Sequence, residues 1–90
     1  MSESTNQPRI TLIGKPGCHL CDEARAVILG VCAARGVTWE EISILDQPEL
    51  AEEYWTEIPV VLVDGIKIAF WRVNKQQIVD ALDRGRTVKP

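Results

Sequence analysis

Two cysteines separated by two residues, Cys18 and Cys21, stand between an apolar run and a segment with helical periodicity. The apolar run predicts a strand over Ile10–Gly14, and the apolar residues after Cys21 recur at helical spacing as far as Arg35. Cysteines three positions apart at the start of a helix have Cα atoms about 5 to 6 Å apart, a separation that a disulfide spans without distortion. The chain is thus restricted to folds that place a cysteine pair at a helix N-terminus after a strand.

The position of the pair indicates its chemistry. Cys18 faces unpaired backbone N–H groups and the positive end of the helix dipole, and both favour a thiolate. Because the thiolate is the nucleophile of thiol–disulfide exchange, Cys18 is the candidate attacking residue and Cys21 the candidate resolving residue. Lys15 and His19 are candidates for tuning the acidity of the Cys18 thiol, His19 also as a proton relay. A solvent-exposed residue without such a role is an equally good interpretation of either one.

Composition limits what else the chain can do. Ninety residues, 46% of them apolar and 26% charged, are typical of one globular domain. A net charge of -3 with scattered Lys and Arg gives no reason to expect nucleic-acid binding, and no apolar run is long enough to span a membrane. Three cysteines is an odd number, which disfavours a disulfide-stapled secreted domain. Residues 1–8 lack the layout of a signal peptide, so we expect a disordered lead and a cytoplasmic protein.

The rest of the chain alternates strand and helix patterns within one predicted domain, 9–84, followed by a tail at 85–90. Cys32 lies beside the apolar face of the first helix, so core packing is its expected role. Five further elements are predicted: a strand over 37–45, a helix that starts at 46–49 with Asp46 as its cap, a buried strand over 58–63, a strand over 67–70 after a turn at 64–65, and a helix between Asn74 and Gly85.

The order β-α-β-α-β-β-α resembles the thioredoxin fold, an α/β architecture in which three helices flank a four-stranded mixed sheet. The matching segments are 14–21, Tyr54 with 58–61, and 64–65, and they are similar to the small bacterial glutaredoxin-like proteins. The resemblance implies that Cys18 attacks, that Cys21 resolves, and that Pro59 follows a cis peptide bond. It also implies that the Ile58 backbone pairs with an extended substrate chain by strand addition. The expected activity is that of a thiol–disulfide oxidoreductase that cycles through a disulfide between Cys18 and Cys21.

Two departures from the family pattern concern glutathione. Glutaredoxins usually carry Pro-Tyr or Pro-Phe between the cysteines, where this chain has His19 and Leu20, and they hold glutathione partly through a Gly-Gly-x-Asp element before the last helix. Residues 70–74 replace that element with Phe-Trp-Arg-Val-Asn. Trp71 and Arg72 are candidate groove residues, with packing at a strand end as the alternative for Trp71. We therefore expect weak glutathione recognition, a protein or small-molecule disulfide as substrate, and recycling by another thiol or a reductase.

A second interpretation is a non-catalytic module that binds a metal ion or an iron–sulfur cluster, or that senses redox state, through the same cysteines. A mononuclear zinc site takes four protein ligands, or three and a water molecule. Cys32 is eleven residues beyond Cys21, and on one helix it lies about 16 Å further along, too far to close such a site. The expectation is therefore a redox dithiol with no metal or other cofactor, in a monomer without nucleic-acid or membrane partners.

Overall fold

The computed structural model of the chain describes residues 9–87, with side chains through residue 84, so the predicted lead at 1–8 and the side chains of the predicted tail lie outside it. Its elements follow the predicted order β-α-β-α-β-β-α, and the last helix continues past residue 84. The elements are β1 (Ile10–Gly14), α1 (His19–Arg35), β2 (Trp39–Ser43), α2 (Pro48–Tyr54), β3 (Val60–Val63), β4 (Ile66–Phe70) and α3 (Lys75–Thr87).

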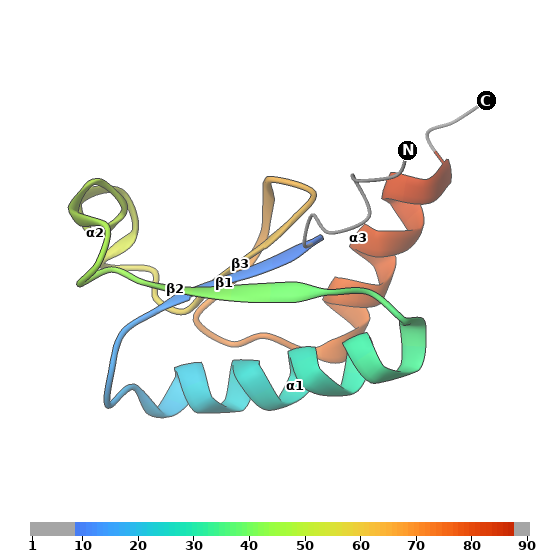
Figure 1. Cartoon of the computed structure of the whole chain (residues 1–90), viewed down its shortest axis with the longest axis horizontal. Coiled ribbons are helices and arrows are strands. Elements are labelled where there is room, and N and C mark those ends of the chain that lie inside the picture. The colour runs from blue at the N-terminus through green and yellow to red at the C-terminus, as the bar shows by residue number, and fades with distance from the viewer. Residues whose placement is uncertain (1–8, 88–90) are drawn as a thin grey trace.

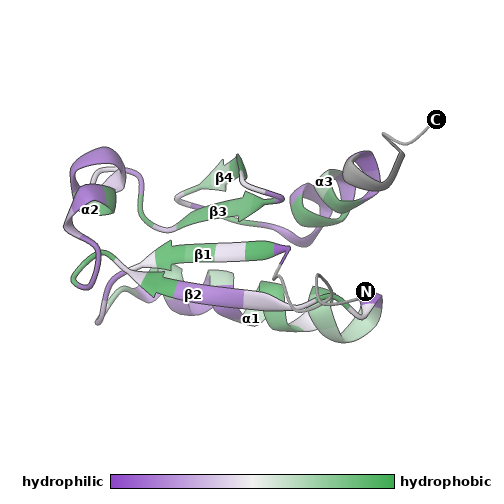
Figure 2. Ribbon diagram, turned by 45° about the horizontal axis from the view of Figure 1, so that its top comes forward, coloured by the Kyte–Doolittle hydropathy of each residue, from purple (hydrophilic) through white to green (hydrophobic). Residues whose placement is uncertain are grey.

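The four strands form one mixed sheet in the order β2-β1-β3-β4. β1 pairs with β2 in parallel and with β3 antiparallel, and β4 extends the antiparallel part as the second edge. The parallel pair requires a crossover, which α1 supplies. Figure 2 shows β1 and β3 as mainly hydrophobic, whereas the middle of the edge strand β2 is hydrophilic. The two central strands therefore carry the apolar residues of the sheet into the core.

The core lies between the sheet and two helices, α1 and α3 (Figure 1). α1 packs against β1 and α3, and α3 packs against β3 and β4. The residues of these helices that are buried recur at helical spacing, which is why the periodicity predicted their inner faces. They are Cys21, Ala24, Ile28 and Val31 on α1, and Ile78, Ala81 and Leu82 on α3. Cys32 is half-buried and packs against this core, as expected for a packing role.

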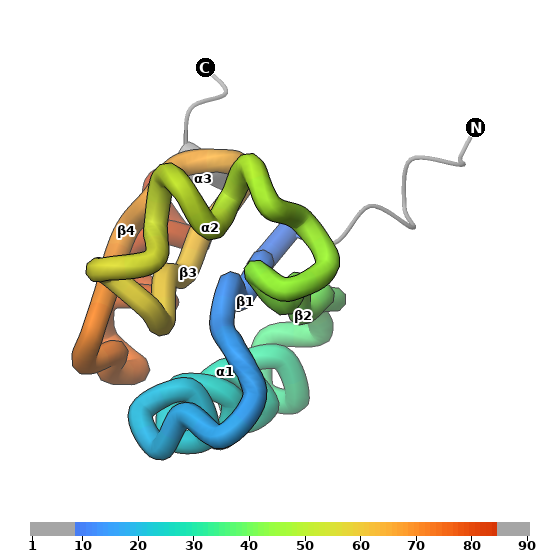
Figure 3. The backbone as a smooth tube through the Cα atoms, turned by 90° about the vertical axis from the view of Figure 1, so that its left-hand side faces the viewer, coloured from blue at the N-terminus to red at the C-terminus, as the bar shows by residue number. Residues whose placement is uncertain are grey.

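α2 and the loop between β1 and α1 lie at the same end of the sheet, which Figure 3 shows facing the viewer. α2 buries none of its residues. Its start corrects one prediction: the cap position is Gln47, not Asp46, and Gln47 makes no side-chain capping bond. The Asp46 N–H donates to the Ser43 carbonyl, so Asp46 belongs to the turn before the helix.

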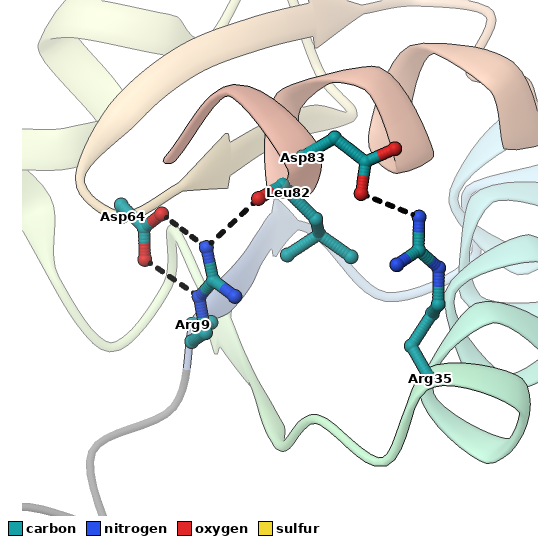
Figure 4. A network of polar contacts seen from close by, with 5 residues as sticks. All are labelled: Arg9, Arg35, Asp64, Leu82 and Asp83. Carbon is teal, nitrogen blue, oxygen red and sulfur yellow. Dashed lines mark hydrogen bonds and ion pairs between the residues drawn. The ribbon is translucent and has the colours of Figure 1, made fainter. Parts of the chain in front are cut away.

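Polar contacts hold α3 at the opposite end of the sheet (Figure 4). The Arg9 guanidinium donates to both carboxylate oxygens of Asp64, at 3.0 and 2.7 Å, and to the Leu82 carbonyl at 3.3 Å. Hydrogen bonding to Arg9 lowers the pKa of Asp64. Arg35 on α1 pairs with Asp83 on α3 at 2.8 Å. These contacts join the start of β1, the β3–β4 turn and the C-terminal ends of both long helices.

Candidate active site

Cys18 occupies the cap position of α1. Its backbone is extended, with φ −96° and ψ 117°, and its Sγ accepts a hydrogen bond from the Cys21 N–H at 3.2 Å. The helix begins at His19, two residues earlier than the periodicity predicts, so Cys21 lies in its first turn. The Cys18 sulfur therefore takes the place of a capping oxygen and meets the positive end of the helix dipole.

The two thiols differ in their exposure to solvent. Cys18 is half-buried, whereas Cys21 is 0% exposed, and both are free thiols. Burial first, and then the hydrogen bond with Cys18, raise the pKa of the Cys21 thiol from 9.0 to about 11, while a hydrogen bond from the Lys15 backbone N–H opposes the shift. At neutral pH Cys21 is thus a protonated thiol, and Cys18 is the sulfur that a substrate can reach.

The side chains of Lys15 and His19 are not hydrogen-bonded to the Cys18 sulfur in the described part of the chain. The contact of Lys15 with the dithiol is the backbone hydrogen bond to Cys21, and its side chain is exposed. The His19 imidazole is also exposed, with its Nε2 3.5 Å from a carboxylate oxygen of Glu23 one helical turn away. Within residues 9–87 neither side chain is hydrogen-bonded to the Cys18 sulfur. Their role in tuning its acidity stays a prediction.

Gly14, the last residue of β1, lies directly against Cys21. A Cβ atom placed on Gly14 would be 2.9 Å from the Cys21 Sγ, which is closer than real Cβ atoms approach a sulfur. The sequence predicts that Gly14 ends the first strand, but it does not show the contact with Cys21. The one signal for such a contact is that a glycine in a strand often marks the close approach of another group. The missing side chain of Gly14 therefore sets where the sulfur of Cys21 can sit.

We expect Gly14→Ala to change the equilibrium between the dithiol and the disulfide several-fold, because the buried Cys21 sulfur must move to admit the new methyl group. The measurement is equilibration of the protein in dithiothreitol redox buffers, followed by alkylation and mass spectrometry. Gly30→Ala is the matched control, since a Cβ at Gly30 on α1 meets nothing within 4 Å. Wild-type equilibria for both variants would refute the role assigned to Gly14.

The raised pKa of Cys21 predicts a pH-dependent loss of stability in the reduced protein. In the unfolded chain the thiol ionises near 9.0, whereas in the folded protein it keeps its proton to about 11. Below about pH 9 the group is protonated in both states and does not affect the pH dependence; between about pH 9 and 11 the unfolded state gains from ionisation, so stability falls.

The measurement is urea unfolding of wild type and Cys21→Ala from pH 7.5 to 10.5 under reducing conditions. The difference in the free energy of unfolding between the two proteins should shrink above pH 9, because only wild type has the Cys21 thiol. Burial also raises the pKa of Cys32, but Cys32 is present in both proteins, so its effect cancels. A difference that does not vary with pH contradicts the prediction.

The segment before β3 is tied to the end of β4 by Trp71. The Trp71 N–H donates to the carbonyls of Pro59 at 2.9 Å and Glu57 at 3.3 Å, and its indole N–H donates to the Thr56 carbonyl at 2.8 Å. Pro59 is fully buried, and the Ile58–Pro59 peptide bond is cis. The structure thus places Ile58 and Pro59 beside Trp71, although twelve or more residues separate them in the sequence.

A groove of about 750 Å³ opens between this segment and the start of α1. Six apolar side chains line it: Leu20, Ile58, Ile68, Ala69, Phe70 and Trp71. Arg72 and Gln77 are its polar lining residues. Leu20, which lies between the two cysteines in the sequence, shares this groove with three of the predicted substrate-binding residues, Ile58, Trp71 and Arg72. The fourth, Pro59, is not among its lining residues.

The sequence profile of a family described as "Glutaredoxin-like domain (DUF836)" matches residues 9–83. This chain belongs to the glutaredoxin-like domain family. An uncharacterized protein of Mycobacterium tuberculosis is 23% identical over 78 residues, covering 81% of this chain and 80% of that protein. A structural-genomics target from X. campestris aligns with TM-score 0.69 and 25% identity over 83% of this chain and 96% of its own. Thioredoxin 1 from Thermosipho africanus aligns with TM-score 0.61 and 15% identity over 88% and 94%. The glutaredoxin-like domain therefore has the predicted thioredoxin fold.

At the start of α3, the glutaredoxin-like domain uses its polar groups to cap the helix. The Asn74 Oδ1 accepts from the Gln77 N–H at 2.9 Å, and the Asn74 N–H donates to the Gln77 Oε1 at 3.0 Å. This reciprocal pair satisfies two backbone donors at the helix start. The first turn carries no acidic residue. A ligand ammonium at this position would therefore find an amide oxygen that is already engaged and no carboxylate.

In the part of the chain that the structure describes, no group of three or more His, Cys, Asp and Glu side chains could hold a metal ion. No helix in the same residues is long and apolar enough to cross a bilayer. Trp55 is 66% exposed and does not line the groove.

Proposed function

We propose that this glutaredoxin-like domain is a thiol–disulfide oxidoreductase that reduces disulfides through Cys18 and Cys21. The asymmetry of the pair is the observation that carries the proposal. Cys18 is accessible and lies at a helix N-terminus with a backbone N–H on its sulfur, whereas Cys21 is buried and its pKa is raised to about 11. An accessible nucleophile with a protonated resolving thiol beside it is the arrangement that exchange chemistry needs.

The proposed reaction has two steps. The Cys18 thiolate attacks one sulfur of the substrate disulfide; the S–S bond breaks, a new S–S bond joins Cys18 to the substrate, and the leaving thiolate takes a proton from solvent. Cys21 then gives up its proton and attacks the Cys18 sulfur; the S–S bond between Cys18 and the substrate breaks, and the second substrate sulfur leaves as a thiolate that takes up one proton. The substrate gains two electrons and ends as two thiols, and the enzyme ends with a disulfide between Cys18 and Cys21.

The first step prepares the second. The hydrogen bond with Cys18 and the charge on Cys18 both raise the pKa of Cys21. Forming the mixed disulfide removes the negative charge from Cys18 and weakens its sulfur as a hydrogen-bond acceptor. The pKa of Cys21 therefore falls when the substrate is attached, and its attack is favoured at that stage.

The Ile58 backbone is the proposed docking point for the substrate chain. Within residues 9–87 no hydrogen bond engages its N–H or its C=O, and Ile58 lines the groove beside the dithiol. An extended substrate segment can pair with these groups by main-chain hydrogen bonds. We place this reaction in a cytoplasmic monomer without a cofactor, because a reducing compartment keeps such a dithiol ready to act.

The test is to trap the intermediate with Cys21→Ser. Reduced Cys21→Ser mixed with 2-hydroxyethyl disulfide should accumulate one adduct on Cys18, whereas wild type should pass to the internal disulfide and keep no adduct. Peptide mapping by mass spectrometry locates the adduct, and Cys18→Ser is the matched control that should form none. An adduct on Cys32, or none on the Cys21→Ser variant, would rule out the proposed mechanism.

We further propose that glutathione resets the enzyme poorly. Lys15 and Arg72 can pair with the carboxylates of the tripeptide, but the start of α3 offers its ammonium no acidic group. Coupled assays should show slow turnover with glutathione and glutathione reductase and faster turnover with a thioredoxin-reductase system. Asn74→Asp should increase the use of glutathione, because it supplies the missing carboxylate and keeps a residue suited to helix capping. Efficient wild-type turnover with glutathione alone contradicts this proposal.

A further inference from the structure

One wall of the groove is aromatic and exposed. The side chains of Phe70 and Trp71 are 42% and 54% exposed, and their rings meet edge to face with centroids 5.2 Å apart. The indole N–H of Trp71 is fixed on the Thr56 carbonyl, and Lys67, which pairs with Glu57, lies 5.1 Å from the centre of the Phe70 ring. The wall is thus held in place before any ligand arrives, as in pre-formed binding sites.

The backbone of Trp71 is in a conformation that favours glycine. Its φ is 63°, in the left-handed region that bulky residues rarely adopt. The hydrogen bonds to Pro59, Glu57 and Thr56 hold it there. A tryptophan that is strained and yet more than half exposed is not explained by core packing. Strain of this kind is concentrated at ligand-binding positions.

The groove is also cationic at its rim. Arg72 is exposed, and no acidic side chain among the described residues pairs with it. Lys75 follows at the start of α3, whose first turn carries no acid. Gln77, the other polar residue of the groove, is engaged with Asn74. The site therefore offers an apolar surface and, next to it, a positive charge that lacks a partner.

We propose that this groove selects protein disulfides in which the attacked cysteine is followed by a large apolar residue and a nearby carboxylate. The apolar side chain packs against Trp71 and Phe70, and the carboxylate pairs with Arg72. The occupant is an extended peptide, because the N–H and C=O of Ile58, a lining residue of the same groove, make no hydrogen bond among the described residues. This inference rests on the proposed function and names its substrate class. Glutathione, which has no large apolar side chain, leaves the aromatic wall unused.

The experiment compares two disulfide-linked peptide dimers of equal length. In one, each cysteine is followed by Phe and then Glu; in the other, by Ser and then Gln. Reduced protein is mixed with each dimer in a stopped-flow instrument, and the second-order rate of the first exchange is measured. We expect the Phe-Glu peptide to react at least tenfold faster, a preference of about 1.4 kcal/mol. The third substrate, 2-hydroxyethyl disulfide, has no large apolar side chain and no carboxylate, so its rate measures thiol–disulfide exchange without the proposed groove contacts.

Three variants separate binding from folding. Trp71→Gly should fold, because glycine adopts φ 63° without strain, and it should lose most of the preference, measured as the ratio of the rates for the two peptides. Arg72→Gln should lose the part of the preference that comes from the Glu side chain of the peptide, and the remaining preference should no longer depend on salt concentration. Trp55→Ala, at an exposed tryptophan outside the groove, should keep the full preference.

The outcomes distinguish this inference from the proposed function. Equal rates for the two peptides in wild type, with 2-hydroxyethyl disulfide still reduced, would overturn the substrate class and leave the oxidoreductase intact. Equal slowing of all three substrates by Trp71→Gly would show a structural role for Trp71 and also overturn it. Failure of wild type to reduce any of the three would overturn the proposed function itself.

Discussion

Replacement of Cys18 by serine is expected to abolish disulfide reduction, down to the uncatalysed rate. A serine hydroxyl is not ionised at neutral pH, and no other described thiol can take its place: Cys21 is buried, and Cys32 packs against the core on the far part of α1. The measurement is a single turnover of pre-reduced protein with 2-hydroxyethyl disulfide, followed by counting the remaining thiols. This assay does not depend on which reductant recycles the enzyme.

Cys32→Ser is the matched control and should retain nearly the full rate. The half-buried position of Cys32 also predicts a modest loss of stability from the hydroxyl, which unfolding measurements will separate from activity. Loss of activity in a folded Cys32→Ser variant, or activity that survives in Cys18→Ser, is incompatible with the assignment.

Leu12→Ala is expected to be the most damaging substitution to the fold. Leu12 is 0% exposed in the central strand β1, opposite Val61 of β3. Removing a buried leucine side chain costs about 2 to 5 kcal/mol, while a chain of 90 residues is stable by about 4.5 to 13.5 kcal/mol. Urea unfolding of the reduced protein should therefore show that the variant has lost a large part of the free energy of unfolding of wild type.

Leu45→Ala makes the same chemical change at a side chain that is 69% exposed. Its effect should stay within about 0.5 kcal/mol. Similar losses for the two variants would mean that the core does not lie where the structure places it.

Local patterns predicted the element order, because periodicity and turn residues are encoded in neighbouring positions. β1 has the predicted bounds, Ile10–Gly14. The second strand is predicted over 37–45 but spans Trp39–Ser43, because β1 offers only five residues for it to pair with. The third strand is predicted from residue 58 but begins at Val60, after the proline, which has no N–H for the ladder.

The site was predictable only where its residues are neighbours in the sequence. The spacing of Cys18 and Cys21 predicted a dithiol at the start of a helix, but the periodicity placed the first helical residue at Cys21, two residues late, because cysteine is not among the usual capping residues. The approach of Gly14 to the Cys21 sulfur and the bonds from Trp71 to the segment before β3 depend on how distant segments pack. Nothing in a local pattern specifies such contacts.

The placement of the ion pairs has a consequence for protein engineering. The hydrogen bond from Arg9 to the Leu82 carbonyl and the ion pair of Arg35 with Asp83 hold α3 at the end of the sheet away from the dithiol (Figure 4). Distant sites without shared partners contribute to stability almost additively. Libraries that randomise residues 70–72 can therefore vary the groove while leaving these contacts with α3 unchanged, and such libraries suit a search for altered ligand binding.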